Sequence, residues 1–411
     1  MKKAIYLLFV VLVALASLTG CSNEKGNEAS KEFDANADFD TIVEQTKGTT
    51  VSFYGWGGDE LRNKWLDTTV AAALEDKYDI TLERVPMDID QILTKLSGEK
   101  QAGQENGSID MIWINGENFY SAKENGLLFG PFADKLPNFK KNIDPDAAEI
   151  QKDFGYPIEG YEAPYGKAQL VLINDNAVTP ETPKSTGDLL EYVKKYPGKV
   201  TYPALPDFTG SAFVRNIIYD IVGWEQFMNM PADKTTVKEA IEPALAYLRE
   251  LNPYLWNQGK TFPATSPEVD NMFADGELVM NMSYNPYSVA VSIEKGIYPD
   301  TARAFLFDQG TIGNTNYIAI AGNSPHKAAA MVAINEILSA EMQAGQFSQL
   351  KALPVVEYSK LTEDEKILFD QVNIGKGTIP QDELLAKRLL EMPAHLVPLI
   401  EEIWAEEVVG K

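Results

Sequence analysis

Three segments of the sequence combine glycine with acidic, aromatic or hydroxyl side chains, a composition suited to binding a small molecule. They are residues 55–59, 115–120 and 207–211. Glycine lets a backbone approach a ligand closely, and a few polar groups then fix the orientation of that ligand. Each segment precedes a run typical of a helix, and such loops meet beyond the carboxyl ends of the strands in an open α/β sheet. We therefore expect the three segments to line one cleft.

The aromatic residues near these segments differ in the role that their context predicts. Trp56 lies between glycines in a loop, which favours stacking on a ligand, whereas Trp65 lies on an apolar helical stripe, which favours the core. Tyr284 belongs to an aromatic turn, where a ring face over a cation contributes about 0.5–2 kcal/mol. The candidate ligand contacts are Tyr54, Trp56, Gly57, Gly58, Asp59, Asn115, Glu117, Asn118, Tyr120, Tyr165, Asp207, Phe208, Thr209, Gly210, Ser211, Tyr284 and Asn285.

The acidic residues of the first two segments have two interpretations. Asp59 and Glu117 both lie where a helix is expected to begin, and capping that helix would contribute about 0.5–2 kcal/mol without any ligand. Carboxylates at these positions also cancel the positive helix end that would attract an oxyanion. The sign of the charge therefore favours a cationic ligand. The third segment, with Thr209, Gly210 and Ser211, could instead hold a hydroxyl, a carboxylate or a phosphate.

Composition excludes several classes of chemistry. One cysteine and two histidines leave no disulfide framework and no Cys/His metal cluster, and a net charge of −24 argues against a nucleic-acid partner. The sequence carries no nucleophile elbow, phosphate-binding loop, HExxH or dinucleotide fingerprint. We predict no catalytic residue, no metal and no cofactor. One enzymatic alternative stays open, a glycan-cleaving carboxylate pair drawn from Asp59, Glu117 and Asp207.

The N-terminus predicts export and lipid anchoring. Two lysines precede an uncharged run, and residues 18–21 resemble the lipobox of bacterial lipoproteins, in which Cys21 would carry the lipid. Residues 1–20 are then a signal peptide, and the polar residues 21–48 form a flexible tether. The alternative is an ordinary anchor helix with a chance cysteine.

From residue 49 onward, strand patterns alternate with helix patterns, which is typical of an α/β fold with mostly parallel sheets. The first part reads as strand, helix, strand, helix and strand at residues 49–54, 61–74, 80–85, 90–100 and 109–114. Further strands are expected at residues 165–174, 199–202, 277–284, 302–307 and 316–321. The end of the chain favours helices separated by prolines.

Several short motifs, in a fixed order, resemble type-2 periplasmic solute-binding proteins of ABC importers. They are the glycine-rich loop after the first strand, the run at residues 113–119, the strand beginning near Tyr165, the helix start at residues 183–190 and the run at residues 338–343. Their order and spacing across residues 49–411 carry the resemblance. The Trp-Ile-Asn-Gly-Glu-Asn-Phe run resembles the YnjB-like branch, relatives of which bind thiamine, polyamines or ferric ion.

This resemblance implies a two-lobe fold of type 2, with each lobe a mostly parallel sheet flanked by helices and a cleft between the lobes. Residues 49–168 and 309–411 would form the first lobe, and residues 169–308 the second. The implied protein is a monomeric receptor on the outer face of the cytoplasmic membrane. It would close on a small solute and deliver that solute to a permease driven by an ATPase.

The resemblance fixes the transport role better than the ligand. A thiamine-like or polyamine cation agrees best with the acidic segments. An oxyanion, ferric ion or sugar is the alternative within the same class of receptor. A sensor that presents its loaded ligand to a membrane receptor would have the same sequence features.

Overall fold

The computed structural model describes residues 33–411, and every element below lies within the unit formed by residues 35–411. Its larger sheet has the strand order β2-β1-β3-β12-β4, and β7 also pairs with β12. These strands are β1 (Thr49–Gly55), β2 (Ile80–Pro86), β3 (Met111–Ile114), β4 (Leu128–Phe129), β7 (Glu162–Lys167) and β12 (Thr315–Ala321). The first three strands pair in parallel, whereas β12 runs antiparallel to its three partners.

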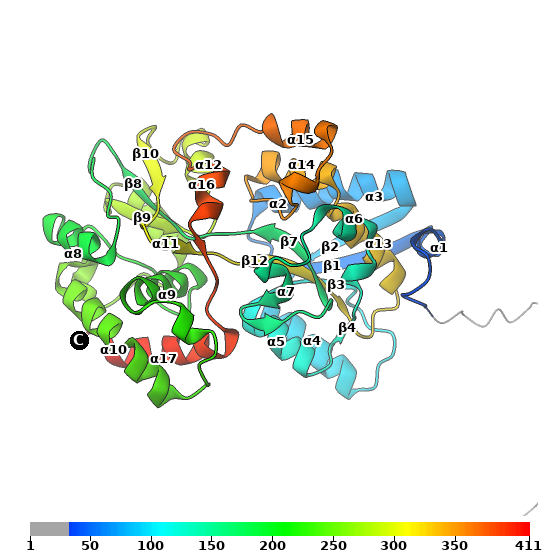
Figure 1. The fold of residues 1–411 in the computed structure, drawn as a ribbon, viewed down its shortest axis with the longest axis horizontal. Helices are drawn as coiled ribbons and strands as arrows, with labels where there is room; N and C mark the ends of the chain where they lie inside the picture. Colours follow the sequence, from blue (N-terminus) through cyan, green and yellow to red (C-terminus); the bar gives the residue numbers. More distant parts are fainter. Residues whose placement is uncertain (1–32) are drawn as a thin grey trace, which may run out of the picture. The chain divides into compact units, whose positions relative to one another are not determined.

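Helices cover both faces of this sheet because successive strand residues point to opposite sides. On one face, α2 (Glu60–Trp65) continues through a π-helical turn, Leu66–Val70, into α3 (Ala71–Tyr78). The predicted apolar stripe is buried there, from Trp65 to Leu74. On the other face, α4 (Ile89–Gln101) and α5 (Gly116–Glu124) form a hydrophobic cluster with strand residues of β3 and β12 (Figure 1).

The smaller sheet departs from the expected parallel arrangement. Its strands β8 (Val171–Asp175), β9 (Met280–Ser283) and β10 (Ala302–Phe305) have the order β10-β8-β9 and are antiparallel. Antiparallel neighbours need no helical crossover in a fixed direction, so the alternation of patterns along the chain does not determine strand direction. The helices around this sheet are α8 (Thr186–Lys195), α9 (Phe208–Val222), α10 (Lys234–Leu251), α11 (Ser266–Ala274) and α12 (Ser288–Glu294).

Two of the predicted strands differ from those observed. The long strand expected at residues 165–174 is two strands, β7 and β8, which belong to different sheets. The strand expected at residues 199–202 is a loop, although its apolar residues Val200 and Tyr202 are buried as in a strand. Thr201 between them is buried as well, so the run belongs to the core without having the backbone conformation of a strand.

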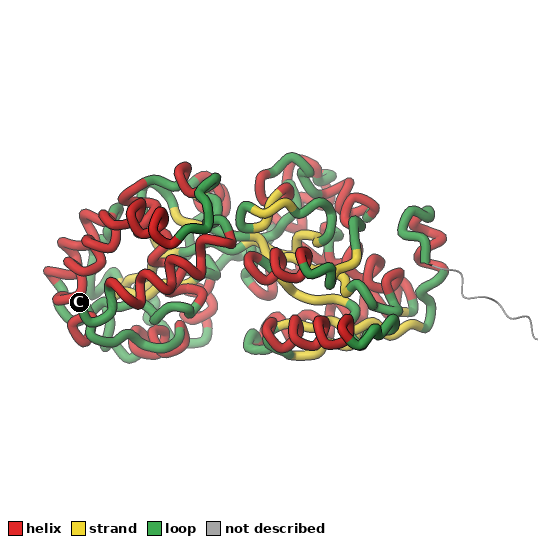
Figure 2. Tube along the Cα trace, turned by 90° about the horizontal axis from the view of Figure 1, so that it is seen from below, coloured by secondary structure: helices red, strands yellow, loops and turns green. Residues whose placement is uncertain are grey.

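The C-terminal part of the chain lies beside both sheets. Helix α13 (Lys327–Ile337) packs with α1 (Phe39–Glu44) and α14 (Ala340–Leu350) with α2, whereas α17 (Val397–Glu407) packs with α10. In Figure 1 the chain passes from α15 (Glu363–Asp370), beside α14, to α16 (Gln381–Ala386), beside α12, and so crosses from one group of elements to the other; Figure 2 shows the two groups from below. The placement of α17 differs from the assignment of all residues 309–411 to the first lobe. The other predicted lobe boundaries remain a prediction.

The expected tether ends earlier than residue 48. Helix α1 (Phe39–Glu44) begins at the N-cap Asp38, buries Ile42 and packs with α13. The buried side chain of Ile42 and the Asp38 cap both help to hold α1 against the folded body. The predicted signal peptide, Cys21 and the first part of the tether lie outside the described residues. None of the helices in residues 33–411 has the length and apolar character needed to cross a membrane.

The remaining elements are short. They are α6 (Pro137–Asn142), α7 (Ala148–Gln151), α15 (Glu363–Asp370), α16 (Gln381–Ala386), β5 (Lys152–Asp153), β6 (Tyr156–Pro157), β11 (Thr311–Ile312), β13 (Arg388–Leu389) and the 3₁₀ turns Ala133–Lys135, Glu225–Phe227, Asn252–Tyr254, Trp256–Gly259, Tyr358–Lys360 and Ala394–Leu396.

Candidate ligand-binding site

The loop after β1 is held by its own residues. Asp59 caps α2 by accepting a hydrogen bond from the Arg62 backbone N–H at 3.1 Å, and its carboxylate lies 3.4 Å from Arg62 Nε. A Cβ at Gly58 would lie 2.1 Å from the Trp56 ring, so glycine is needed there for the ring to fold over the loop. Trp56 nevertheless remains 55% exposed, as a stacking residue should be. Capping accounts for Asp59 without a ligand.

A small cavity, the Trp56 pocket, opens beside this loop. It is lined by Phe53, Gly55, Trp56, Arg62, Asn63, Leu66, Arg84, Trp113 and Tyr165. The Arg62 guanidinium lies 5.0 Å from the centroid of the Trp113 ring and 5.2 Å from that of Tyr165. A cation of the protein therefore already occupies these aromatic faces. Tyr165 is fully buried, while Tyr54 packs on the other face of the sheet with Met87, Ile89 and Leu93.

The loop after β3 exposes one carboxylate. Gly116 donates its backbone N–H to Asp153 Oδ2 at 2.5 Å, and the Asn115 side chain donates to Asn316 Oδ1 at 2.6 Å. Glu117, at the first turn of α5, is exposed. Tyr120 is 40% exposed and meets Tyr156 edge to face, and Asn118 is half-buried. Glu117 is therefore the carboxylate of this loop that is accessible to a ligand.

The third predicted segment is largely structural. The Asp207 carboxylate accepts from the backbone N–H groups of Thr209 and Gly210, and from both the N–H and the hydroxyl of Ser266. It therefore joins the start of α9 to the start of α11. A Cβ at Gly210 would lie 2.1 Å from the carbonyl oxygen of Pro203, so this glycine serves a close backbone approach.

Two aromatic residues lie beside the start of α9. The ring of Phe208, 43% exposed, meets the ring of Tyr284 edge to face at 4.9 Å. The Tyr284 hydroxyl is buried without a hydrogen-bond partner among the described residues. Asn285 serves the turn after β9, because its side-chain oxygen accepts from the Tyr287 backbone N–H. Phe208 is therefore the exposed ring of this pair, whereas Tyr284 is 8% exposed and packs in a hydrophobic core cluster. Contact of these two residues with a ligand stays a prediction.

Buried charges surround the next turn of α9. Arg215 is fully buried and donates to the Glu391 carboxylate and to the Ser211 hydroxyl. Ser211 in turn donates to Glu401 Oε1 at 2.7 Å. Burial raises the pKa of both glutamates, Arg215 opposes that rise, and the Glu117 charge adds to it. Glu117 therefore lies within electrostatic reach of both carboxyls.

We name Glu117, Asp153, Glu391 and Glu401 the acidic junction. Its members come from α5, β5, the segment after β13 and α17, so the junction joins parts of the chain that are far apart in sequence. The Glu117 charge also raises the pKa of Asp153, although burial contributes more. Glu391 Oε2 is buried without a partner among the described residues. Arg215 is the basic side chain that pairs with a member of the junction.

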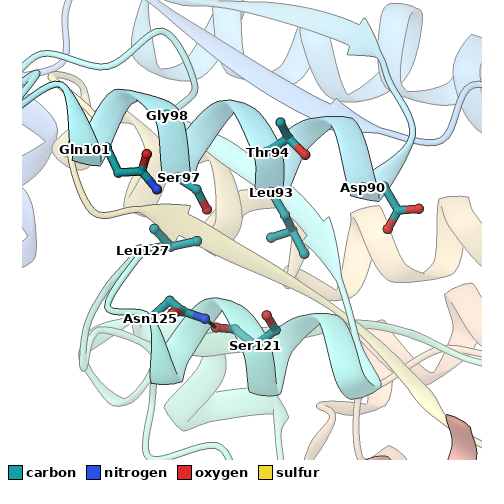
Figure 3. A pocket seen from close by; sticks show the side chains of 9 residues that line it. All are labelled: Asp90, Leu93, Thr94, Ser97, Gly98, Gln101, Ser121, Asn125 and Leu127. Atoms are coloured by element: carbon teal, nitrogen blue, oxygen red, sulfur yellow. Dashed lines mark hydrogen bonds between the residues drawn. The ribbon is translucent and has the colours of Figure 1, made fainter.

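A broader groove lies apart from these residues. It runs between α4 and α5 and is lined by Asp90, Leu93, Thr94, Ser97, Gly98, Gln101, Ser121, Asn125 and Leu127 (Figure 3). None of the predicted contacts lines it. Its surface offers neither an aromatic face nor a group of buried charges, so we assign it no ligand.

Comparison with known proteins shows the family to which the chain belongs. Residues 69–367 match the family described as bacterial extracellular solute-binding protein. The chain belongs to this family. It is also 35% identical over 371 residues to protein YnjB of Escherichia coli (strain K12), covering 90% of this chain and 93% of that protein. The expected transport receptor is therefore confirmed.

Solved structures share the fold of this solute-binding protein. An ABC transporter protein from Clostridium perfringens has a TM-score of 0.61 at 21% identity, covering 87% of this chain and 98% of its own. The spermidine/putrescine ABC transporter substrate-binding protein PotD from Streptococcus pneumoniae has a TM-score of 0.62 at 14% identity, covering 87% and 99%. The type-2 binding-protein fold is thus confirmed. The family to which the chain belongs consists of solute-binding proteins, so the glycan-cleaving alternative is withdrawn.

Sequence reasoning missed the buried charges of this solute-binding protein. Arg215 is the one charged residue between Phe208 and Tyr219 of α9, and that charge in a largely apolar run was the available signal of a buried partner. Glu391 is 176 residues further along the chain, and nothing in the sequence pairs it with Arg215. Glu401 lies in a helix rich in acids, where it resembles its exposed neighbours.

The buried carboxyl of Glu162 makes the stability of the protein depend on pH. Glu162 in β7 is 1% exposed, and neither of its carboxylate oxygens has a partner among the described residues. Burial raises its pKa well above the ordinary 4.5, and the neighbouring Asp153 carboxyl raises it further. The protonated form is thus favoured by folding, so this group's contribution to stability is full below pH 4.5 and is lost as pH rises through the folded pKa.

Replacing the Glu162 carboxyl should make the stability of the protein depend less on pH. We expect Glu162→Gln to raise the melting temperature relative to the wild type at pH 8, and to leave a much smaller difference at pH 4, because glutamine cannot ionise. Thermal unfolding of both proteins across this range measures the difference, with the exposed Glu105→Gln as control. A difference that is the same at every pH would contradict a buried ionisation.

Proposed function

We propose that this receptor binds a small solute through a cationic group placed at the acidic junction, with Phe208 and Tyr284 against the rest of the molecule. The observation that carries the proposal is the exposed Glu117 carboxylate, which lies within electrostatic reach of Glu391 and Glu401. A bound cation would relieve the repulsion among these carboxyls, in the way that opposite charges favour ionised forms. Delivery to a permease driven by an ATPase follows from the family.

The carboxylates that support a cationic ligand are only in part those expected from the sequence. Asp59 and Asp207 do not support it, because the first pairs with Arg62 and the second holds Ser266 and the start of α9. Glu117 does support it. The added support comes from Glu391 and Glu401, which the sequence alone did not single out.

Lipid anchoring belongs to the same proposal. Cys21 would carry the lipid after removal of residues 1–20, and the polar residues that follow would link it to α1. The receptor would then stay close to its permease at the membrane surface. Mass spectrometry of the protein from a membrane fraction, before and after Cys21→Ala, would detect the lipid.

Calorimetric titration tests the ligand class. The relative named spermidine/putrescine substrate-binding protein makes spermidine a suitable first probe, and thiamine offers a cationic ring. We expect at least one of them to bind ligand-free protein, and Glu117→Gln to weaken that binding about tenfold, since a hydrogen bond to a charged group contributes roughly 1.5–3 kcal/mol.

The control for this titration is Glu105→Gln, which removes an exposed charge from the loop after α4. It should leave the affinity unchanged and so separates a local effect of Glu117 from a general effect of net charge. Absence of binding by both probes, or equal affinities for the wild type and Glu117→Gln, would overturn the cationic ligand.

A further inference from the structure

Two arginines line the Trp56 pocket and differ in how well they are paired. Arg84 donates from Nε and Nη2 to the two oxygens of Asp67, each at 2.8 Å, which is a complete bidentate ion pair. Arg62 has the looser 3.4 Å approach of its Nε to Asp59 and an electrostatic interaction with Tyr165, and this Nε is buried without a hydrogen bond among the described residues. Its planar group thus retains unused donor capacity.

The position of Arg62 fits a ligand group rather than a purely structural role. Its side chain is 14% exposed, and the guanidinium lies over the rings of Trp113 and Tyr165, which fix its plane. Trp56, which is more than half exposed, lines the same pocket. A guanidinium held flat beside an exposed indole matches the two in-plane oxygens of a carboxylate or phosphate.

We propose that the Trp56 pocket is an oxyanion subsite, in which Arg62 receives a carboxylate or phosphate of the same solute whose cationic group lies at the acidic junction. The inference rests on the proposed function and narrows it: the solute carries both charges instead of being a simple polycation. Asp59 holds Arg62 in place until the oxyanion arrives, and then shares it.

The short stretch of chain between the Trp56 pocket and the acidic junction allows one small molecule to reach both. Trp113 of the pocket and Glu117 of the junction are four residues apart, and four extended residues span at most about 14 Å. The backbone folds into α5 within this stretch, which shortens the separation further. The opposite charges of the two places would also fix the direction in which such a solute binds.

Matched pairs of probes test the subsite. Thiamine and thiamine monophosphate differ by a phosphate, and agmatine and arginine differ by a carboxylate, while each pair keeps a cationic group. We expect the oxyanion member of at least one pair to bind about tenfold more tightly by calorimetry, as one charge-assisted bidentate contact would give. The pair that shows the preference identifies the oxyanion.

Variants assign that preference to Arg62. Arg62→Met should abolish it, whereas Arg249→Met, on the exposed ion pair with Glu242, should keep it. Asp59→Asn keeps a capping side chain but removes the competing charge, so it should strengthen binding of the oxyanion member. Asp59→Asn still tests the oxyanion subsite if Arg62→Met fails to fold.

The outcomes separate this inference from the proposed function. Binding of cationic probes with no preference in either pair, or a preference that survives Arg62→Met, overturns the subsite and leaves the cationic ligand standing. Absence of binding by all four probes overturns both. Weaker binding of the oxyanion member in Asp59→Asn also overturns the subsite.

Discussion

Arg215→Met is expected to lower the free energy of unfolding by about 3–5 kcal/mol, the cost of breaking a buried ion pair on one side. Arg215 is 1% exposed and is the cationic partner of Glu391, which is itself 5% exposed. Without the guanidinium, Glu391 would stay buried beside Tyr219 and Tyr284, whose hydroxyls have no hydrogen-bond partner within residues 33–411. An uncompensated carboxylate in that place must either ionise at high cost or take up a proton.

The pH dependence of Arg215→Met follows from the same contacts. Burial already raises the pKa of Glu391, and Arg215 opposes that rise, so removing Arg215 should raise the pKa further. A raised acid pKa means stability lost as pH increases, and the variant should therefore be weakest in alkaline solution. Urea unfolding at pH 5 and pH 8 measures both effects.

Two further variants make this prediction specific. Replacing both partners, in Arg215→Met with Glu391→Leu, should recover most of the lost stability, because an apolar pair of similar volume needs no compensation. Arg249→Met breaks an exposed pair and should cost no more than about 1 kcal/mol. If Arg215→Met costs as little as Arg249→Met, the buried pair does not have the role assigned to it.

The fold of the N-terminal part of the chain could be predicted from the sequence because its signals are local. The run at residues 49–54 is rich in residues that favour strands, Asp59 caps the next helix, and the apolar stripe from Trp65 to Leu74 repeats at the helical period. Strand direction in the smaller sheet was not readable. It depends on which strands become neighbours, and the central strand β8 precedes both of its partners, β9 and β10, by more than a hundred residues.

The candidate site was readable only in part, for a related reason. Glu117, Phe208 and Tyr284 lie in loops or at helix starts, where exposed or aromatic residues stand out. Asp59 and Asp207 carry the same sequence signal but serve as caps, and only their partners distinguish the two roles. Arg215, Glu391 and Glu401 meet through tertiary packing. Pairing across such distances has no local pattern.

The two tryptophans that flank Asp59 give the second large prediction. Trp65 is 1% exposed, its ring centroid lies 6.4 Å from that of Tyr165, and it packs against Gly345 of α14. Removing so large a buried side chain leaves a cavity that the surrounding helices cannot fill. We therefore expect Trp65→Ala to lower the free energy of unfolding by about 3–5 kcal/mol.

Trp56→Ala is the matched variant, because it removes the same side chain nine residues earlier from a loop where the ring is 55% exposed. Its stability should change by no more than about 0.5 kcal/mol, as for most surface positions, while binding of the solute should weaken. Urea unfolding and calorimetric titration of both variants separate the two roles. Equal losses of stability would show that exposure does not distinguish these rings. Unchanged solute binding in Trp56→Ala would show that the indole does not contribute to binding. Arg62 would then hold the solute in the Trp56 pocket without the indole.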